Sequence, residues 1–195
     1  MVWKIITLLF FFYTIKAQIA LPTFQGIHNN QNNITGTPEY PLQAVVSGLS
    51  LDYNDATWDY SIGYRFTPNV NGTITQLGGS FDGGHTVRLW KRSDGSFLGS
   101  VVVSDPNNSW SYVDLSSSVS VTSGDEYVVM VYSNSNGMHR YRITGSFPQT
   151  AGNITINYSC YVRYYNSDNY PSSWTHETRT DYVWGVPDIT FVPDS

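Results

Sequence analysis

Short hydrophobic runs alternate with polar clusters along most of the chain. From residue 44 onward the runs are rich in Val, Ile, Tyr and Thr and are separated by Gly, Asn, Asp and Ser. They recur about every 8–12 residues, a spacing typical of β-sandwiches. No stretch keeps the 3.6-residue period of an amphipathic helix. The pattern predicts strands over residues 44–50, 60–67, 73–81, 85–91, 96–103, 110–115, 126–133, 138–145, 154–165 and 181–192.

One turn signal and the absence of repeats narrow the fold class. Asp94-Gly95 lies between two hydrophobic runs and is a strong hairpin signal. The chain has no internal repeat of the length typical of propellers or solenoids. We therefore expect an all-β fold over residues 44–195, a two-sheet antiparallel β-sandwich of the jelly-roll or immunoglobulin-like kind.

Residues 1–17 have the pattern of a secretory signal peptide. Lys4 precedes an apolar run over residues 5–15, and Ala17-Gln18 is the expected cleavage point. A membrane-spanning helix needs about 20 apolar residues, about twice the length of the run over residues 5–15. No second apolar run follows it, so we expect no span in the mature chain. The protein is then secreted, to the extracellular space or the cell surface. A buried N-terminal helix or a membrane anchor is the alternative interpretation.

Residues 18–43 form an extended apolar peptide followed by a polar linker. The apolar part, residues 19–27, contains Pro22, which argues against a helix, and the Asn-rich stretch after it is typical of a linker. We hypothesise that Leu21, Phe24 and Ile27 enter a groove on a neighbouring subunit and add a strand to its sheet. The alternative is that the peptide packs on its own domain as an edge strand.

Composition and charge exclude several classes of protein. Charged residues make up 13% of the chain, and 15 residues are tyrosine, whereas coiled coils and helical bundles need abundant Glu, Lys, Leu and Ala. The net charge is −5, and the loss of two lysines, Lys4 and Lys16, with the signal peptide takes it to −7. Because the arginines are dispersed, neither nucleic acid nor anionic lipid is an expected partner.

Cys160 is the single cysteine of the chain. It can form neither an internal disulfide nor a cysteine-based zinc site. It lies two positions from both Tyr158 and Val162, and this strand-like spacing of two favours a buried apolar position. An intermolecular disulfide is the alternative.

Several of these turns and strands together resemble a known family. The matching segments are 63–74 (Gly-Tyr-Arg-Phe-Thr-Pro-Asn-Val-Asn-Gly-Thr-Ile), 87–90 (Val-Arg-Leu-Trp), 94–98 (Asp-Gly-Ser-Phe-Leu), Trp110 with 119–124, 127–129 and 182–191. In this order they are similar to the bacterial "domain of unknown function 4082" family. The resemblance implies an extracellular β-sandwich, often found beside carbohydrate-active or adhesive modules, with no agreed catalytic residues. Residues 134–180 fit the family pattern poorly, and we expect functional differences there.

The sequence contains no catalytic or cofactor motif. The histidines, at positions 28, 85, 139 and 176, lack metal-ligand spacing, and no Gly-x-Ser-x-Gly nucleophile elbow is present. Asp82, Asp125, Glu126 and Asp188 are expected at turns or strand ends. We therefore expect a protein that is not an enzyme and holds no cofactor. A calcium ion near residues 52–55 is an alternative, although Asx clusters usually form turns.

Aromatic and hydrogen-bonding side chains gather between residues 158 and 174. Aromatic faces beside amides and charges suit sugars, but aromatic residues also fill sheets and protein interfaces. In a strand, residues 161, 163 and 165 would share one face, and residues 160, 162 and 164 the other. The candidate carbohydrate-binding or interface residues are Tyr161, Arg163, Tyr165, Tyr170 and Trp174.

Five Asn-x-Ser/Thr sequons are present, against about three expected by chance placement of the motif. Modification is best supported at Asn33, which lies in the linker. The candidate N-glycosylation sites are Asn33, Asn71, Asn107, Asn153 and Asn157.

Two functions are consistent with these features. The leading hypothesis is a secreted structural subunit of an extracellular filament or surface assembly, joined by donation of the N-terminal peptide. Head-to-tail contacts of this kind propagate unless they close, and interfaces favour Tyr and disfavour Lys and Glu. The alternative is a carbohydrate-binding or adhesion module that uses residues 158–174. The expected partners are further copies of the chain, in an oligomer or filament, or glycans.

Overall fold

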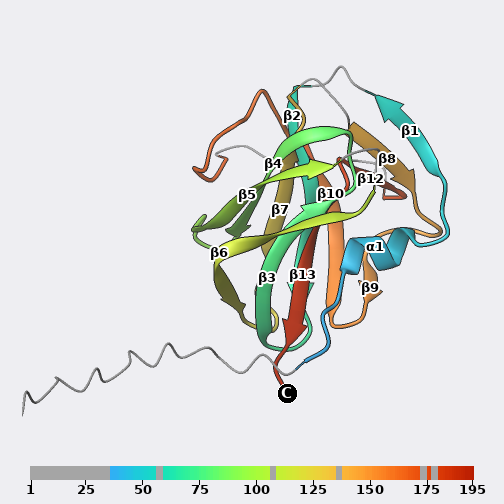
Figure 1. The fold of residues 1–195 in the computed structure, drawn as a ribbon. Coiled ribbons are helices and arrows are strands. Elements are labelled where there is room, and N and C mark those ends of the chain that lie inside the picture. Colours follow the sequence, from blue (N-terminus) through green and yellow to red (C-terminus); the bar gives the residue numbers. More distant parts are fainter. Residues whose placement is uncertain (1–35, 56–58, 106–108, 135–137, 172–174, 177–179) are drawn as a thin grey trace, which may run out of the picture. The chain divides into compact units, whose positions relative to one another are not determined.

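The fold is described from a computed structural model of the chain (Figure 1). The structure describes residues 36–55, 59–105, 109–134, 138–171, 175–176 and 180–195. These residues form antiparallel strands and one short helix, so the predicted all-β, sandwich-like fold is confirmed. No helix in this part of the chain has the length and hydropathy needed to cross a membrane.

Helix α1 precedes all the strands and spans Pro41–Val46. The strands are β1 (Leu51–Asp55), β2 (Tyr60–Pro68), β3 (Gly72–Gly79), β4 (Gly83–Lys91), β5 (Phe97–Asp105), β6 (Ser111–Val121), β7 (Tyr127–Tyr132), β8 (Met138–Arg142), β9 (Gln149–Ala151), β10 (Ile154–Arg163), β11 (Thr175–His176), β12 (Tyr182–Trp184) and β13 (Pro187–Pro193).

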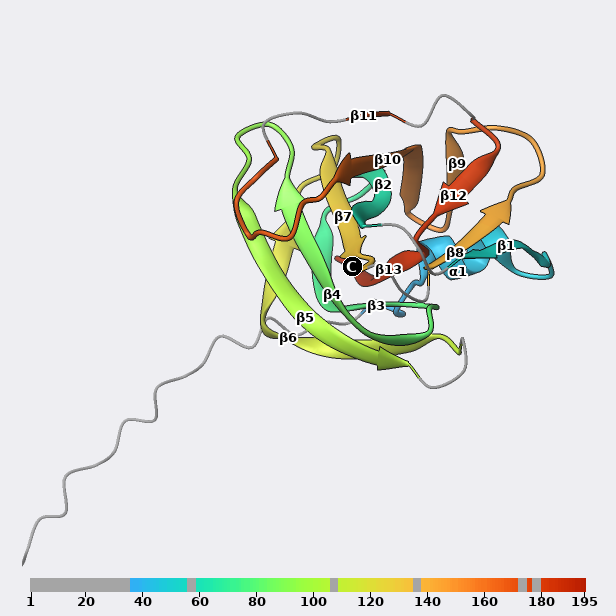
Figure 2. The same ribbon diagram turned by 90° about the horizontal axis from the view of Figure 1, so that it is seen from above.

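The strands form three antiparallel sheets (Figures 1 and 2). The largest has the order β11-β10-β2-β7-β4-β5, with β9 also paired to β10. A second sheet has the order β13-β3-β6, and a small third sheet the order β1-β8-β12. Seen from above in Figure 2, β4, β5 and β6 curve around one side of the domain, and β1, β8 and β12 lie at the other.

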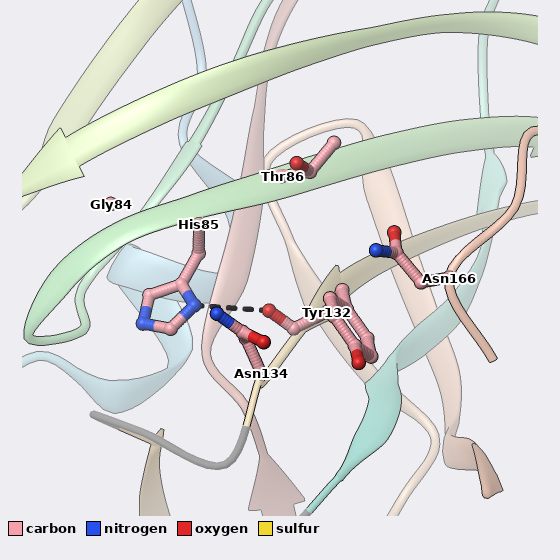
Figure 3. Close-up of a pocket in the computed structure, with 6 residues that line it drawn as sticks. All are labelled: Gly84, His85, Thr86, Tyr132, Asn134 and Asn166. Carbon is pink, nitrogen blue, oxygen red and sulfur yellow. Dashed lines mark hydrogen bonds between the residues drawn. The ribbon is translucent and has the colours of Figure 1, made fainter. Parts of the chain in front are cut away.

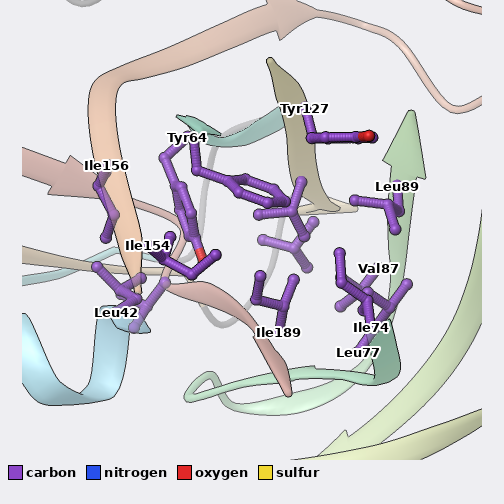
Figure 4. Close-up of a cluster of buried hydrophobic side chains, with 14 of the residues drawn as sticks. Leu42, Tyr64, Ile74, Leu77, Val87, Leu89, Tyr127, Ile154, Ile156 and Ile189 are labelled. Carbon is purple, nitrogen blue, oxygen red and sulfur yellow. The ribbon is translucent and has the colours of Figure 1, made fainter. Parts of the chain in front are cut away.

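The core lies between the largest sheet and the sheet of β13, β3 and β6. Tyr64 of β2, Leu77 of β3 and Ile189 of β13 are fully buried, and Figure 4 shows them converging with side chains from β4 and β10. Alternate strand residues point to the same face, which is why β2 and β7 each bury every second side chain here. Full burial of each such aliphatic side chain contributes about 1.5–3 kcal/mol.

The strand predicted over residues 44–50 is wrong, because residues 44–46 belong to α1 and residues 47–50 form a turn and no strand. Pro41 lies in the first turn, where a missing N–H is tolerated. The carboxylate of Asp188 accepts hydrogen bonds from the backbone N–H groups of Leu42 and Gln43 at 3.0 and 2.9 Å. Asp188, expected to be a simple turn or strand-end residue, is fully buried in β13 and caps the helix from 146 positions away.

The structured domain also begins before residue 44. Glu39 and Phe191 of β13 exchange backbone hydrogen bonds of 2.7 and 2.9 Å, and Leu42 is fully buried. Residues 39–43, which we expected in the linker, therefore pack on the domain. The strand predicted over residues 181–192 is divided at Gly185 into β12 and β13, which belong to different sheets. Three short strands, β1, β9 and β11, are not predicted by the sequence pattern.

The predicted hairpin at Asp94-Gly95 is confirmed, because β4 and β5 pair on either side of it. Asp94 accepts a hydrogen bond from the backbone N–H of Ser96 at 2.9 Å. Gly95 has a φ of 70°, a left-handed conformation that glycine adopts without the clash of a Cβ. The turn thus ends β4, a strand whose residues contribute to the candidate site.

Candidate functional site

The outer face of the largest sheet carries a second, smaller hydrophobic cluster. The segment after β10, residues 164–171, crosses this cluster, and we call it the covering loop. Trp90 donates from Nε1 to the backbone oxygen of Asp168 in this loop at 2.8 Å. Cys160 is buried, as predicted, and burial raises the pKa of its thiol. The buried members of the cluster are Trp90, Val128, Met130, Cys160 and Val162.

Two of the sequence candidates for sugar binding lie together at the start of β2. The ring centroids of Tyr60 and Tyr161 are 5.7 Å apart, in an edge-to-face arrangement. The guanidinium carbon of Arg163 is 5.8 Å from the centroid of the Tyr60 ring. Trp174, a third candidate, lies outside the described residues.

The remaining two candidates lie on the other face of the sheet. Tyr165 and Tyr170 are half-buried and pack against the outer hydrophobic cluster. The prediction that Tyr165 shares a face with Tyr161 is therefore wrong. The physical reason is that β10 ends at Arg163, and the left-handed φ of 52° at Tyr164 breaks the strand alternation.

A small polar cleft opens at one rim of the largest sheet. It forms where β4 begins, where β7 ends and where the covering loop passes, and its volume is about 150 Å³. We call it the rim cleft. Figure 3 shows the ring of Tyr132 between the side chains of Asn134 and Asn166. The lining residues are Gly84, His85, Thr86, Tyr132, Asn134 and Asn166.

His85 holds one wall of the rim cleft in place. Its ring is buried, with Nδ1 3.0 Å from the backbone oxygen of Tyr132 and Nε2 2.9 Å from that of Asp82. The ring also meets Phe81 edge-to-face at 5.3 Å. In either neutral tautomer one of these nitrogens donates to its backbone oxygen, so His85 lies between the start of β4 and the end of β7 and is a positioning residue.

Arg88 lies on the same face of β4 as Thr86, two residues further along. Its Nε atom donates to Oδ1 of Asp168 in the covering loop at 2.7 Å. The residue is 9% exposed, yet among the described residues its Nη1 atom is buried without a hydrogen-bond partner. A buried donor without a partner costs about 1–3 kcal/mol, so it calls for a physical explanation.

Asp59 lies directly before β2 and carries a second buried atom that lacks a hydrogen-bond partner among the described residues. Its side chain accepts a hydrogen bond from the Tyr132 hydroxyl, which raises the pKa of Tyr132. Its Oδ1 atom is buried, and no described residue provides a hydrogen-bond donor to it. One donor and one acceptor are therefore left unsatisfied on the two charged residues that flank Tyr132.

The sequence pattern missed the rim cleft because its residues come from separate segments. The start of β4, the end of β7 and residue 166 form no contiguous motif. The one local signal was Arg88, a charged residue between the buried Val87 and Leu89 of a hydrophobic strand. A guanidinium at such a position requires hydrogen-bond partners. Only the folded structure shows that Nε has one and that Nη1 has none among the described residues.

The arrangement is suited to reversible binding through hydrogen bonds. Asn134 and Asn166 each offer an amide donor and an amide acceptor, and Thr86 offers a hydroxyl. Tyr132 adds an aromatic surface beside them. Within the described part of the chain, no group of three or more His, Cys, Asp or Glu side chains is arranged to hold a metal ion.

The structure places three of the five sequon asparagines. Asn71 is exposed, and its Oδ1 atom accepts a hydrogen bond from the Ser123 backbone at 2.9 Å. Asn153 and Asn157 are half-buried, and their Nδ2 atoms donate to Glu39 at 2.7 Å and to Glu126 at 3.0 Å. Because Nδ2 is the atom that carries a glycan, Asn71 is the best placed of the three. Glycosylation stays a prediction, and the two remaining candidates, Asn33 and Asn107, lie outside the described residues.

The residues of the hypothesised donor strand, Leu21, Phe24 and Ile27, also lie outside the described residues. The same is true of the signal peptide predicted over residues 1–17. Strand donation and secretion therefore stay predictions.

Comparison with known proteins agrees with the family found by resemblance in the sequence but corrects its extent, because the match runs through residues 134–180, which we expected to fit poorly, and ends at residue 183. No curated protein matches the chain. A family model described as "Domain of unknown function (DUF4082)" matches residues 50–183, which is more than half of the chain and includes every residue of the rim cleft. The chain therefore belongs to the DUF4082 family.

Proposed function

We propose that the protein is a non-enzymatic, secreted binding module that holds one sugar residue of a glycan in the rim cleft. The observation that carries this proposal is a pair of unsatisfied buried atoms, Nη1 of Arg88 and Oδ1 of Asp59, on two residues that interact with Tyr132, which lines the cleft. A sugar hydroxyl both donates and accepts hydrogen bonds. One hydroxyl can therefore accept from Arg88 while another donates to Asp59, so that a bound sugar removes both penalties.

The size of the rim cleft limits what it can hold. A volume of about 150 Å³ corresponds to about five water molecules, since each takes about 30 Å³ in the liquid. A cleft of this size takes one ring with its hydroxyls and is too small for a typical drug-sized ligand, whose pockets span about 300–1,000 Å³.

The local charges favour a neutral sugar over an acidic one. Arg88 is paired with Asp168, and Asp59 adds a second carboxylate beside the cleft. The three side chains together carry one net negative charge, and the whole chain carries −5. A carboxylate or sulfate on the ligand would be repelled by this field.

The direct test is an array of neutral mono-, di- and tetrasaccharides of glucose, mannose, galactose and xylose, followed by titration of the best ligand. Arg88→Met removes the donor and keeps an unbranched apolar chain. Hydrogen bonds to charged groups contribute about 1.5–3 kcal/mol, so we expect this variant to bind at least about 10-fold more weakly.

Arg92→Met is the matched control. Arg92 has a side chain that is 46% exposed and pairs with Glu126 at 3.1 Å, away from the rim cleft, so its replacement should leave the affinity unchanged. Equal affinity of the wild type and Arg88→Met, or no sugar bound on the array, would contradict the proposal.

We also propose, as a second function, that the protein assembles through its sheet edges. β5 and β6 are the terminal strands of their sheets in the described part of the chain. They present exposed apolar side chains, with Val102 64%, Phe97 41% and Val113 36% exposed, and such surfaces favour association.

Deletion of residues 18–27 tests the version of this proposal in which the N-terminal peptide is donated to a neighbouring subunit. It predicts that filaments seen by negative-stain microscopy disappear. Unchanged filaments, or a wild type that stays monomeric at high concentration, would overturn it.

A further inference from the structure

We propose that the outer face of β5 forms a second sugar subsite next to the rim cleft, so that the ligand is a neutral oligosaccharide of at least two residues. The subsite consists of Gly84 in β4 and of Val102 and Ser104 in β5, and we call it the β5 shelf. This inference rests on the proposed function of the cleft. It deepens that function because it gives the ligand a minimum length and a direction across the sheet.

The rim cleft opens on the outer face of the largest sheet. Val87 of β4 pairs with Val131 of β7, and both side chains are buried in the core. Successive residues of a strand point to opposite faces, so the neighbouring residues Thr86 and Tyr132 point outward. Both line the rim cleft (Figure 3).

The pairing of β4 with β5 places the shelf beside the cleft on this same face. Thr86 pairs with Val102, and Gly84, which also lines the cleft, pairs with Ser104. Directly paired residues of antiparallel strands share a face, with their Cβ atoms about 4.5–5.5 Å apart. Val102 and Ser104 therefore lie one strand further out than the cleft wall that β4 provides.

Gly84 is a strand glycine that the described fold does not require. Its φ lies outside the left-handed region, and among the described residues an added Cβ would meet only Oγ of Ser104, at 3.9 Å. Every other described glycine has either a positive φ or an atom within 3.0 Å of an added Cβ. A glycine inside a strand weakens it and often marks the close approach of a ligand to the backbone. A sugar chain that crosses β4 at Gly84 accounts for the missing side chain.

The two β5 residues present a small amphipathic surface. Val102 is 64% exposed, and Ser104 is exposed beside it. The apolar CH face of a sugar ring can pack on the valine methyl groups, while the serine hydroxyl donates or accepts a hydrogen bond. Neither side chain is charged, so the shelf suits a neutral sugar, as the cleft does.

The covering loop leaves the path from the cleft to the shelf open. Asp168 of the loop pairs with Arg88, which places the loop over the sheet on the Arg88 side of Thr86. The shelf lies on the other side, toward the start of β4. Because β5 is the terminal strand of its sheet in the described part of the chain, a longer glycan can continue past the sheet edge into solvent.

The first test compares the best-binding neutral tetrasaccharide from the array with its own monosaccharide, by calorimetric or NMR titration. Val102→Ser should weaken tetrasaccharide binding about 3- to 10-fold, as expected for the loss of one or two methyl groups from a contact. Monosaccharide binding should be unchanged, because the cleft is intact. Val113→Ser is the matched control, since Val113 is an exposed valine on β6, the terminal strand of another sheet. It should leave both affinities unchanged.

The second test fills the position of Gly84. Gly84→Val places a branched side chain in the path of the ligand, so tetrasaccharide binding should fall at least about 10-fold. The midpoint of thermal unfolding should stay level or rise, because a β-branched residue suits a strand better than glycine does. Ser120→Val, at an exposed position of β6, is the control and should change neither affinity.

Each other outcome overturns a defined part of the account. If Val102→Ser leaves tetrasaccharide affinity unchanged while Arg88→Met weakens it, the cleft binds sugar and the β5 shelf is wrong. If Val102→Ser weakens both ligands equally, the valine supports the cleft and forms no subsite of its own. If Val102→Ser lowers only the mass measured by light scattering, Val102 serves contacts between copies and the shelf is wrong.

Two further outcomes are separate from these. If Gly84→Val unfolds at a clearly lower temperature than the wild type, the glycine is structural and the argument from its missing side chain fails. If the wild type binds no sugar, the proposed function fails and the β5 shelf fails with it.

Discussion

Two charged sites in this protein differ in whether the chain itself satisfies their buried hydrogen-bonding atoms. The carboxylate of Asp188 is fully buried and accepts five hydrogen bonds of 2.9–3.0 Å. Next to Tyr132 of the rim cleft, Arg88 and Asp59 each keep one buried atom that no described residue satisfies. The donors to Asp188 are the backbone N–H groups of Leu42, Gln43 and Ile189 and the hydroxyls of Tyr64 and Tyr112.

The difference separates a structural site from a binding site. The Asp188 site joins α1, β2, β6 and β13, and every acceptor position is used by the protein itself. The fold is therefore able to supply hydrogen-bond donors to both oxygens of a buried carboxylate. The unsatisfied atoms at the rim are then most simply explained by a ligand that supplies the missing partners, since a purely structural site would be completed by the chain.

The largest expected effect is on the structural side of this comparison. Asp188→Asn replaces one acceptor oxygen by an NH₂ group that faces N–H and O–H donors, so we expect a loss of about 3 kcal/mol in the free energy of unfolding. Urea denaturation measures this value. Asp194→Asn, at an exposed position near the C-terminus, is the control and should change stability by less than about 0.5 kcal/mol. If Asp188→Asn changes the free energy of unfolding as little as the control does, Asp188 is not a structural centre of the fold.

The second effect is a dependence of stability on pH. Burial raises the pKa of Asp188 to about 6, although the hydrogen bonds from its donors act in the opposite direction. In the unfolded chain the pKa is about 3.9, so the folded state binds the proton more tightly. The stabilisation is fully present below pH 3.9 and is lost as the pH rises through about 6.

This titration should make the difference in stability between the wild type and Asp188→Asn depend on pH. We expect the wild type to gain about 2 kcal/mol relative to the variant between pH 7 and pH 4. Denaturant titrations of both proteins at several pH values measure the gain. A difference that stays constant or narrows at low pH would contradict the assigned direction of the shift.

The third effect compares two equally buried arginines. Arg65 and Arg88 are both 9% exposed, but Arg65 makes two hydrogen bonds of 2.6 Å and one of 2.9 Å to Glu126. Arg65→Met should therefore cost about 2 kcal/mol of stability. Arg88→Met frees only Asp168, which is 59% exposed and returns to water, so its cost should stay below about 1 kcal/mol. Equal losses in denaturant unfolding would show that Arg88 is structural.

The smallest effect on stability is expected at Asp59. Asp59→Asn keeps an oxygen that can accept from the Tyr132 hydroxyl, so stability should change by less than about 0.5 kcal/mol. Sugar affinity should fall about 10-fold, because the charged acceptor for a ligand hydroxyl is lost. Titration with the best array ligand measures the fall. Unchanged affinity would restrict the binding site to the Arg88 side of the cleft.

Local sequence patterns predict the strands well because alternation is a local property. Tyr64 and Phe66 alternate with Gly63 and Arg65 along β2, and both aromatic residues are core residues in the structure. Helix α1 was missed because its cap, Asp188, lies 146 positions away.

The candidate site was predictable only in part, for a related reason. The aromatic cluster of residues 158–174 was identified, but its division between two faces depends on the backbone of Tyr164, which no alternation pattern reports. The rim cleft joins β4, β7 and the covering loop, and its unsatisfied atoms exist only once the three segments are placed together.

The central claim is that the unsatisfied guanidinium of Arg88 serves a ligand and not the fold. The most direct measurement determines both the sugar affinity and the unfolding free energy of the wild type, Arg88→Met and Arg92→Met. We predict that Arg88→Met alone loses at least about 10-fold in affinity while its stability stays within about 1 kcal/mol of the wild type. An Arg88→Met protein that binds as tightly as the wild type, or that loses affinity only in proportion to lost stability, would contradict the account.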